Sequence, residues 1–461
     1  MRHLILTLVC AGAILDARVL DVQSGLVQSW REGRDRYVSP DGIDGAPGSF
    51  DEPMSLAFAL SDRSPAEPGD TLWLRGGTYR GTFVSELEGA PGAPIRVRPF
   101  PGERAVIDSA PSAAPALTVN GSWTVYWGFE ITSSDPQRRS AQPGSWPSDL
   151  RRGSGIESHG PHNHFVNLVV HDLAAGLGIW SESEGSLAYG NLIFYNGWQG
   201  PDRPHGHGIY TQNRRGWREI AENIVFSQFS HGIHAYGSSE AYLNNITLRG
   251  NVVFNNGLIS GDGPQRDILV GGGREAENIV IEENSTYGPA YSMLGYAAGC
   301  LETVVLANYL VGTDPLRLNH CTPTRLEGNT FHGAAAEFQR AHPRNDYISG
   351  TPSGVVVQVR PNRYEAGRAH VIVYNWDRRP VVDIDPAGVL DDDAPYEVRD
   401  VQNHAGPPVV SGFYRRGSVI SIPVAGLEAA GAAGDVPAVP RHTAPEFAVF
   451  ILRRVRSPEI D

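Results

Sequence analysis

The chain has 461 residues, of which 41% are hydrophobic and 19% charged, so it is expected to fold and is not a disordered protein. This length exceeds what one ordinary compact core holds, which predicts two modules or a solenoid. The net charge of −13 argues against nucleic acid and anionic membranes as partners, because the overall field repels both. No lysine occurs, which excludes a lysine base.

The first residues show the pattern of a secretory signal. Met1, Arg2 and His3 precede an apolar run over residues 4–15, and a basic start followed by a short apolar stretch is typical of such signals. The run is too short to cross a bilayer, and no other apolar stretch is long enough. We therefore expect residues 1–17 to be a signal peptide, the protein to be secreted or periplasmic, and no insertion into a membrane.

An asparagine recurs through the middle of the chain at spacings of 21 to 33 residues. The recurring asparagines are Asn167, Asn191, Asn223, Asn251, Asn284, Asn308 and Asn329. An apolar residue stands three positions before all but Asn167, and a mostly apolar residue stands two positions after each. A fixed local pattern at variable spacing predicts stacked β-coils with loop insertions. The stacked asparagines can then bond amide to amide, which satisfies groups that are costly to bury alone.

A second column consists of a small or acidic residue followed by isoleucine. Its members are Gly155-Ile156, Gly178-Ile179, Gly208-Ile209, Gly232-Ile233 and Asp267-Ile268. Side chains alternate between the two faces of a strand, so the isoleucines are expected to fill the interior while the next residue faces outward. Two strand columns in each coil are therefore predicted.

The N-terminal segments resemble a known superfamily. Residues 36–42, 68–74 and 77–79, followed by residues 94–97 and 102–108, are similar to the first coils of pectate-lyase-like right-handed parallel β-helix proteins. The resemblance covers roughly residues 36–340 and implies an all-β solenoid over residues 30–345. It leaves the activity open, because this superfamily includes lyases, hydrolases, epimerases and non-catalytic binders.

The repeat stops after about residue 350. Separate strands are predicted at residues 355–359, 369–375, 380–384, 396–400 and 418–424, with turn-rich stretches between them. These segments look like the β-sandwich modules that are appended to carbohydrate-active enzymes. A small antiparallel β-sandwich domain over residues 350–461 is therefore expected, packed on the solenoid.

Two cysteines beyond the predicted signal peptide, Cys300 and Cys321, lie 21 residues apart. This distance is close to one coil, so the two residues can be neighbours in adjacent coils. A disulfide suits an oxidising compartment, and two free buried thiols are the alternative.

The longest spacings locate the largest insertions, at residues 197–205 and 258–266. Both insertions leave the same turn of their coils, so they should project from the same face, while the coil between them has almost none. We predict a groove with walls about 10 Å apart, since coils stack at about 4.8 Å. Such a groove fits one sugar chain.

Unusual residues gather at the predicted floor of this groove. His207, His231 and Arg266 occupy equivalent positions and should stack, and Tyr210 should lie near His234. Residues 197–275 contain seven arginines and seven acidic residues, so the segment is neutral within an acidic chain. An anionic substrate is therefore least repelled there.

The favoured interpretation is elimination or epimerisation on a uronic-acid polysaccharide. This chemistry needs a cation for the substrate carboxylate, a base for the C5 proton and an acid for the leaving oxygen. Arg266 is the candidate cation, His207 or His231 the base and Tyr210 the acid, with Asp267 beside them. The further candidates for substrate contact are Trp180, Trp198, His205, His234, Arg203, Gln212, Tyr236, Glu157 and Glu182.

Three alternatives stay open. Paired carboxylates for glycoside hydrolysis could come from Glu157, Glu182, Glu222 and Asp267. A metal could be held by His205, His207, His231 and His234, although no cofactor is required by the pattern and a divalent cation is left open. A non-catalytic binder could stack sugars on Trp180, Trp198, Tyr210 and Tyr236. In each case a monomer with a polysaccharide partner is expected.

Overall fold

A computed structural model describes residues 30–238 and 240–455. The predicted signal peptide at residues 1–17 lies outside the described residues. The described part is almost entirely β-structure, with two short α-helices, α1 (Leu56–Leu60) and α2 (Ala336–Gln339), and two 3-10 turns, η1 (Leu258–Ser260) and η2 (Val401–Asn403). The prediction of an all-β chain is confirmed.

Three long sheets of parallel strands build the first module. Sheet A contains β1 (Asp35–Ile43), β2 (Thr71–Leu74), β5 (Ile95–Pro99), β8 (Thr124–Trp127), β11 (His164–Val166), β14 (Leu187–Tyr189), β19 (Arg218–Ala221), β22 (Leu243–Arg249), β25 (Ala276–Glu282), β28 (Cys300–Leu301), β29 (Val304–Leu306) and β32 (Arg325–Glu327). Sheet B contains β3 (Gly77–Arg80), β6 (Ala105–Asp108), β9 (Glu130–Thr132), β12 (Val169–His171), β15 (Leu192–Phe194), β20 (Ile224–Phe226), β23 (Val252–Phe254), β26 (Ser285–Tyr287), β30 (Tyr309–Val311), β33 (Thr330–His332) and β34 (Asp346–Ile348). Sheet C contains β4 (Phe83–Ser85), β7 (Leu117–Val119), β10 (Ile156–Ser158), β13 (Leu177–Ile179), β18 (Ile209–Thr211), β21 (Ile233–Gly237), β24 (Arg266–Gly272), β27 (Tyr291–Leu294) and β31 (Leu316–Leu318).

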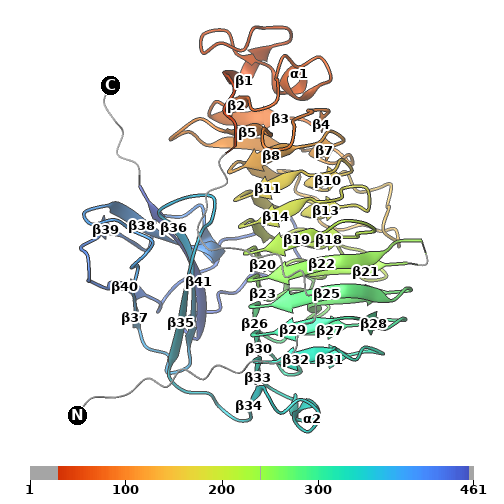
Figure 1. The fold of residues 1–461 in the computed structure, drawn as a ribbon, viewed down its shortest axis with the longest axis vertical. Helices are drawn as coiled ribbons and strands as arrows, with labels where there is room; N and C mark the ends of the chain where they lie inside the picture. Colours follow the sequence, from red (N-terminus) through yellow and green to blue (C-terminus); the bar gives the residue numbers. More distant parts are fainter. Residues whose placement is uncertain (1–29, 239, 456–461) are drawn as a thin grey trace, which may run out of the picture.

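Each coil passes through sheet A, then sheet B, then sheet C, and the next coil stacks on it. Figure 1 shows these coils as a column with α1 at one end and α2 at the other. Parallel strands joined by crossovers connect in the right-handed sense. The first module is therefore the predicted right-handed parallel β-helix.

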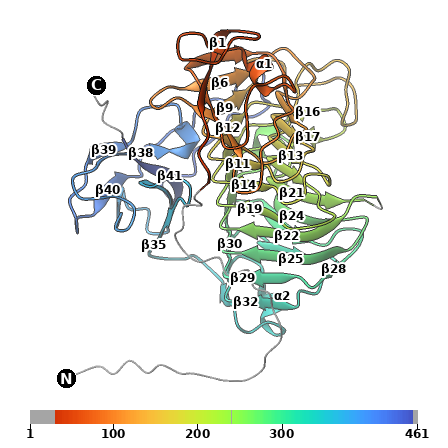
Figure 2. The same ribbon diagram turned by 45° about the horizontal axis from the view of Figure 1, so that its top comes forward.

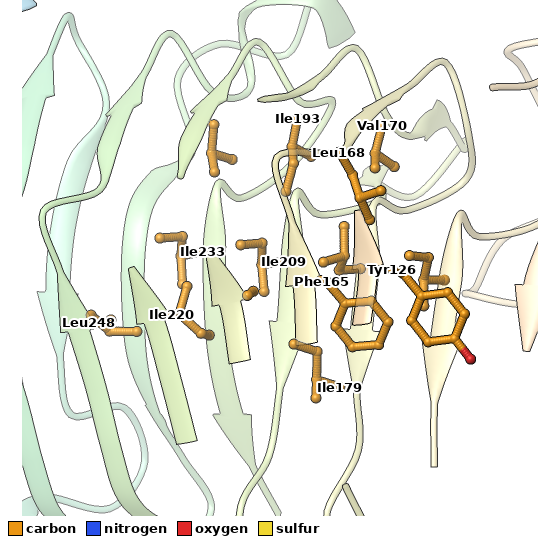
Figure 3. Close-up of a cluster of buried hydrophobic side chains, with 14 of the residues drawn as sticks. Tyr126, Phe165, Leu168, Val170, Ile179, Ile193, Ile209, Ile220, Ile233 and Leu248 are labelled. Carbon is orange, nitrogen blue, oxygen red and sulfur yellow. The ribbon is translucent and has the colours of Figure 1, made fainter. Parts of the chain in front are cut away.

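The interior of the β-helix is filled by stacked apolar side chains. Ile209 and Ile233 of sheet C face Ile220 and Leu248 of sheet A, and all four are inaccessible to solvent. Figure 3 shows these residues aligned along the axis between the sheets. Because one coil cannot bury its apolar face alone, stacking of coils supplies the core.

The predicted asparagine ladder runs along the turn between sheets A and B. Amide Nδ2 atoms donate to the Oδ1 atom of the next coil at 2.8–2.9 Å, from Asn191 through Asn223, Asn251 and beyond to Asn345. Each Oδ1 atom also accepts the backbone N–H of the preceding asparagine, for example Asn191 N to Asn223 Oδ1 at 3.1 Å. The ladder thus supplies hydrogen-bond partners for the buried polar groups of this turn.

The structure corrects the first member of this ladder. Asn167 lies one position too early, with a φ of 50°, and its side-chain oxygen instead accepts from Asn362 of the C-terminal module. Leu168 occupies the ladder position, since its backbone N–H donates to Asn191 Oδ1 at 2.9 Å. The apolar residue three positions before Leu168 is Phe165, which pairs with Ala188 and restores the pattern that seemed to fail.

The second predicted column contains a similar shift. Ile156 and Ile209 both pair with Leu177, so Gly176-Leu177 is the equivalent pair and Gly178-Ile179 lies two residues further on. Gly178 faces outward, beside Tyr210. A shift of two residues keeps the same faces, which is why the alternation alone did not reveal the error.

A second amide ladder lies at the turn between sheets B and C. Asn196 Nδ2 donates to Gln228 Oε1 at 3.0 Å, and Gln228 N–H donates to Asn256 Oδ1 at 3.1 Å. Asn256 Nδ2 donates in turn to Asp267 Oδ1 at 2.8 Å. Asp267 therefore ends an internal ladder.

A disulfide joins Cys300 to Cys321 in adjacent coils, as the spacing predicted. Cys300 lies in β28 and forms a parallel bridge with Cys321. The bond connects coils near the C-terminal end of the β-helix.

An antiparallel module follows the β-helix and packs against sheet B (Figures 1 and 2). Its five-stranded sheet contains β35 (Val355–Pro361), β36 (Arg368–Asn375), β41 (Phe447–Arg454), β38 (Pro395–Asp400) and β39 (Val410–Phe413). A two-stranded ribbon of β37 (Val381–Ile384) and β40 (Ile420–Pro423) covers one face through its own apolar core. Tyr374 and Phe447 on the other face contact Phe254 and its neighbours in sheet B.

Candidate functional site

Loop insertions at the turn from sheet B to sheet C build one wall over the β-helix. Residues 198–205 form an antiparallel hairpin of β16 (Trp198–Gln199) and β17 (Pro204–His205). The second predicted insertion, around η1, leaves the same turn, as expected. However, Gln199 Nε2 donates to Asp262 Oδ2 at 2.9 Å, so the two insertions touch each other. The prediction of a groove between two separate walls is therefore wrong.

A third insertion, residues 133–155, completes this wall and was missed in the sequence. It follows β9 and precedes β10, so it leaves the same turn as the others. Ser140 N–H donates to the Gln199 carbonyl at 3.0 Å, which fastens the loop to the hairpin. The asparagine repeat begins only beyond this loop, so no repeat spacing revealed the insertion.

Three histidines and a tyrosine converge beside the wall, on the outer face of sheet C. The rings of His207 and His231 stack with centroids 5.2 Å apart, and the ring of His234 lies 4.4 Å and 4.8 Å from them. Tyr210 lies edge-to-face with His234 at 5.2 Å. The predicted stacking of His207 on His231, and of Tyr210 near His234, is confirmed.

Hydrogen bonds determine which nitrogen atoms of these imidazoles can still donate or accept. His207 Nε2 and His234 Nδ1 lie 3.2 Å apart and share one hydrogen bond. Their outer atoms, His207 Nδ1 and His234 Nε2, are buried without a hydrogen-bond partner among the described residues. A neutral imidazole has one donor and one acceptor nitrogen. Whichever ring donates in the pair, one outer nitrogen is a free lone pair and the other is an N–H group.

His231 differs, because its Nδ1 atom accepts the backbone N–H of Arg266 at 3.4 Å. The proton of the neutral ring then resides on Nε2, which makes His231 a donor. The sequence predicted that His207, His231 and Arg266 form one column, and these three residues therefore have different chemical roles.

Burial keeps all three histidines neutral. Loss of solvation, with the nearby Arg203, lowers the pKa of His207 to about 3. Burial and the neighbouring imidazoles and arginines lower the pKa values of His231 and His234 well below 6.5. A neutral imidazole keeps the lone pair that a general base needs at neutral pH, while the lowered pKa also makes the ring a weaker base.

Tyr210 lies half-buried with its hydroxyl among polar groups. Gln212 Nε2 donates to the Tyr210 hydroxyl at 3.3 Å, and that hydroxyl lies 3.5 Å from the Tyr236 carbonyl oxygen. Burial raises the pKa of Tyr210, so the phenol keeps its proton. Tyr236 packs on His234 with centroids 4.9 Å apart, and Tyr296, which the sequence did not indicate, packs on Tyr236 at 5.7 Å.

Trp180 continues this aromatic surface. Its ring lies 5.3 Å from that of Tyr210, and its Nε1 donates to the Glu157 carboxyl group. Burial raises the pKa of Glu157. Arg218, fully buried inside the β-helix, donates to the carbonyl oxygens of Ile179 and Trp180 at 2.8 Å and 3.1 Å. Arg218 therefore supports the turn that presents Trp180.

Arg266 lies at the start of β24, in the coil after that of His231 and His234. It is half-buried, and its guanidinium carbon lies 5.5 Å from the Tyr291 ring centroid. Within residues 30–238 and 240–455, no carboxylate lies within ion-pair distance of it. The neighbouring Arg317 differs, because its Nε donates to Asp314 at 2.5 Å. Arg266 thus has an uncompensated positive charge beside the histidines.

Several predicted residues lie away from this cluster. Asp267 points into the interior of the β-helix, where its carboxyl group accepts from Asn256, so it does not reach the outer face of sheet C, and burial raises its pKa well above 3.8. Trp198 and His205 stack on each other at 4.8 Å within the hairpin and are buried. Glu222 lies under the C-terminal module, 3.8 Å from Arg360, and Glu182 is exposed in a turn.

These positions bear on the alternative predictions of glycoside hydrolysis and of a metal site. Of the four carboxyl groups considered for hydrolysis, Glu157 alone lies among the aromatic side chains of sheet C, so these four do not form a pair there. No group of three or more histidine, cysteine or acidic side chains that could hold a metal occurs within the described ranges. No helix of the described chain is long and apolar enough to cross a membrane.

The predicted charge balance of residues 197–275 also needs revision. Arg218 is inside the β-helix, and Arg249 is paired with Glu282 at 2.7 Å. Asp267 is buried as well, so it does not oppose an anion at the surface. The relevant positive charges near the histidines are those of Arg203 and Arg266.

Comparisons with known proteins give partial matches. No protein-family model matches the chain. A segment of 76 residues is 41% identical to pectate lyase PEL9 of Emericella nidulans and spans 16% of this chain and 18% of that protein. Solved structures include pectate lyase Pel9A, at 18% identity over 66% of this chain and 82% of that one, with a TM-score of 0.44. The lacto-N-biosidase of Eubacterium ramulus is 14% identical over 69% and 67% of the two chains, with a TM-score of 0.45.

The matched segment covers less than a fifth of the pectate lyase from Emericella nidulans. The architecture rests instead on the three parallel sheets and the asparagine ladder. The chain folds as a right-handed parallel β-helix followed by an antiparallel β-module.

Proposed function

We propose that the protein is a secreted lyase that cleaves a uronic-acid polysaccharide by β-elimination on the outer face of sheet C. The observation that carries the proposal is the cluster of His207, His231 and His234 with Tyr210, all uncharged, beside the unpaired Arg266. The partial match to pectate lyase PEL9 supports a uronic-acid polysaccharide as substrate, because the name of that protein gives pectate as what it cleaves.

Each group has a defined task in this reaction. The guanidinium of Arg266 binds the uronate carboxylate and stabilises the negative charge that develops when the C5 proton leaves. The free lone pair of the His207–His234 pair lies on a buried nitrogen, and substrate binding must expose this nitrogen before it accepts that proton. The electrons form the C4–C5 double bond, the C4–O bond breaks, and the phenol of Tyr210 gives its proton to the leaving oxygen.

His231 then acts as a donor toward the substrate, because its Nδ1 atom is engaged by the Arg266 backbone. Trp180 and Tyr210 supply aromatic faces on which a sugar ring can stack. This arrangement favours elimination over hydrolysis, since Glu157, Glu182, Glu222 and Asp267 do not form on this face the carboxylate pair that hydrolysis requires.

The decisive experiment is an activity screen on uronic-acid and neutral polysaccharides. Product is measured both by the ultraviolet absorbance of unsaturated uronate and by reducing ends. Equal amounts of both signals on a uronate polymer are expected. Reducing ends without unsaturated product would support hydrolysis instead, and binding without any product would support a non-catalytic role.

Secretion is part of the proposal. The basic and apolar N-terminus and the Cys300–Cys321 disulfide support it, because disulfides persist in oxidising compartments. Detection of the protein, without residues 1–17, in culture medium or periplasm would test it.

A further inference from the structure

We propose that Trp146 and Arg203 form a second sugar-binding subsite on the wall, which binds an acidic sugar of the same polysaccharide away from the reacting bond. The inference rests on the proposed function in one respect, the uronate substrate. It concerns the loop of residues 133–155, which the asparagine repeat did not indicate.

The first observation is the exposure of Trp146. Its side chain is 92% accessible to solvent, the highest value among the exposed large hydrophobic side chains of residues 30–238 and 240–455. An indole ring in water exposes a large apolar surface. Such a residue in a soluble protein is a candidate for contact with a partner.

The second observation is that the loop presenting Trp146 is held in shape. Asp149 accepts hydrogen bonds from Ser140 Oγ at 2.6 Å and from Ala141 N at 2.8 Å, which closes the base of the loop. Gln142 and Ser148 form reciprocal bonds, Nε2 to Oγ at 3.0 Å and N to Oε1 at 2.9 Å. Trp146 stands at the tip inside these closures, so little conformational entropy is lost when a ligand stacks on it.

The third observation connects this tip to the candidate site. Gly144 N–H donates to Asp202 Oδ2 at 3.2 Å, and Asp202 Oδ1 lies 3.1 Å from His205 Nε2. His205 is two residues before His207. The loop tip is thus attached to the hairpin that leads directly into the histidine cluster.

Arg203 supplies the charge beside the indole. One guanidinium nitrogen donates to Ser145 Oγ at 3.0 Å, which places the guanidinium next to the residue that precedes Trp146. Its side chain is half exposed, and the nearest carboxylate, that of Asp202, is 3.8 Å from Nε. Asp202 is already engaged by Gly144 and His205, so it compensates Arg203 weakly.

The two side chains match the chemistry of a uronic-acid residue. The aliphatic face of a sugar ring packs on an aromatic ring, and the carboxylate of the same sugar pairs with the planar guanidinium. A neutral sugar would use the indole alone. The subsite therefore prefers acidic polysaccharide and extends the binding surface along the wall.

The test compares three variants of the full chain, Trp146→Ala, Arg203→Gln and Trp217→Ala. Trp217 is the matched control, because it is a partly exposed tryptophan (42%) in a different turn, after β18. The probes are polygalacturonate, alginate and hyaluronan, together with a trisaccharide of the polymer that binds. Dissociation constants are measured by affinity electrophoresis and fluorescence, and KM and kcat are measured where turnover occurs.

Trp146→Ala is expected to weaken polymer binding, or raise KM, about tenfold with kcat unchanged, while the trisaccharide is unaffected. Arg203→Gln is expected to act in the same direction and to lose its effect at high salt. Trp217→Ala should leave both values unchanged. Because binding is read directly, failure of catalysis leaves this test valid. Unchanged polymer binding in Trp146→Ala, or a native chain that binds none of the three polymers, would overturn the subsite.

Discussion

His207 Nε2 and His234 Nδ1 lie 3.2 Å apart in adjacent coils of sheet C, so two uncharged imidazoles share one hydrogen bond. Burial prevents both rings from ionising. The pair therefore always offers one free lone pair and one N–H group at its outer nitrogens. This relationship underlies the first two predictions.

Replacement of either ring should abolish most turnover. His234→Ala and His207→Ala are each expected to lower kcat by about 10²–10⁴-fold, because the remaining ring loses the partner that orients its tautomer. The measurement is the initial rate of unsaturated product formation. His320→Asn, at an exposed histidine with a φ of 53°, is the control and should keep full activity. Full activity in both alanine variants would exclude the pair as the base.

The acid limb of the rate profile should be displaced. A base works only while unprotonated, and burial lowers the pKa of His207 to about 3. The raised pKa of Tyr210 keeps the acid protonated at neutral and moderately alkaline pH. We expect kcat/KM to remain level from about pH 8 down to about pH 5. A loss of activity centred near pH 6.5 would indicate a solvated histidine base instead.

Arg266 should matter far more than its neighbour Arg317. Arg266→Gln is expected to lower kcat/KM on a uronate polymer by about 10²-fold, because charge on the C5 carbanion is no longer stabilised. Arg317→Gln should have little effect, since Arg317 is engaged by Asp314. Steady-state kinetics on one polymer give kcat/KM for both variants. Similar losses in the two variants would argue against a specific contact between Arg266 and the substrate carboxylate.

The asparagine ladder should contribute most to the stability of the protein at its centre. In Asn251→Ala, the Asn223 amide loses its acceptor and the Ile220 carbonyl loses its donor, all in buried positions. The free energy of unfolding should fall by about 3 kcal/mol or more, since each buried unpaired group costs about 1–3 kcal/mol. Asn345→Ala, at the half-buried end of the ladder, should cost about 1 kcal/mol. Urea denaturation measures both, and equal costs would contradict the ladder account.

Stability should also depend on pH through His171. Burial disfavours the charged ring, but Asp172 at 2.8 Å and Glu130 at 3.1 Å raise the pKa of His171 to about 9. Because this folded value exceeds the unfolded value of 6.5, the stabilisation is complete below pH 6.5 and is lost as pH rises through 9.

His171→Gln should therefore lower the free energy of unfolding by about 2–3 kcal/mol at pH 6, with a smaller difference above pH 9. Denaturant titrations at the two pH values give both differences. A difference that does not change with pH would show that the ring contributes by packing on Phe194, at 4.7 Å, and not by its charge.

The errors of the sequence interpretation share a physical origin. The repeat predicts Asn167 at the ladder position that Leu168 occupies, because a turn with a residue at positive φ admits an asparagine next to the column as well as in it. The sequence predicts Asp267 beside the catalytic groups. Its side chain instead points into the β-helix, where it joins the second amide ladder. Local spacing does not determine on which side of a turn a side chain lies.

The sequence alone determined the β-helix, most of its asparagine ladder, the proximity of Cys300 and Cys321 in adjacent coils, and the convergence of His207, His231, His234 and Tyr210. These features follow from strand alternation and from one short pattern that every coil repeats, so neighbours in space are equivalent positions in sequence. The tertiary structure decided how the insertions meet at Gln199, where Trp146 is presented and which imidazole nitrogens remain free. Those features depend on contacts between loops of unequal length and no common period, and such contacts leave no pattern in a single chain.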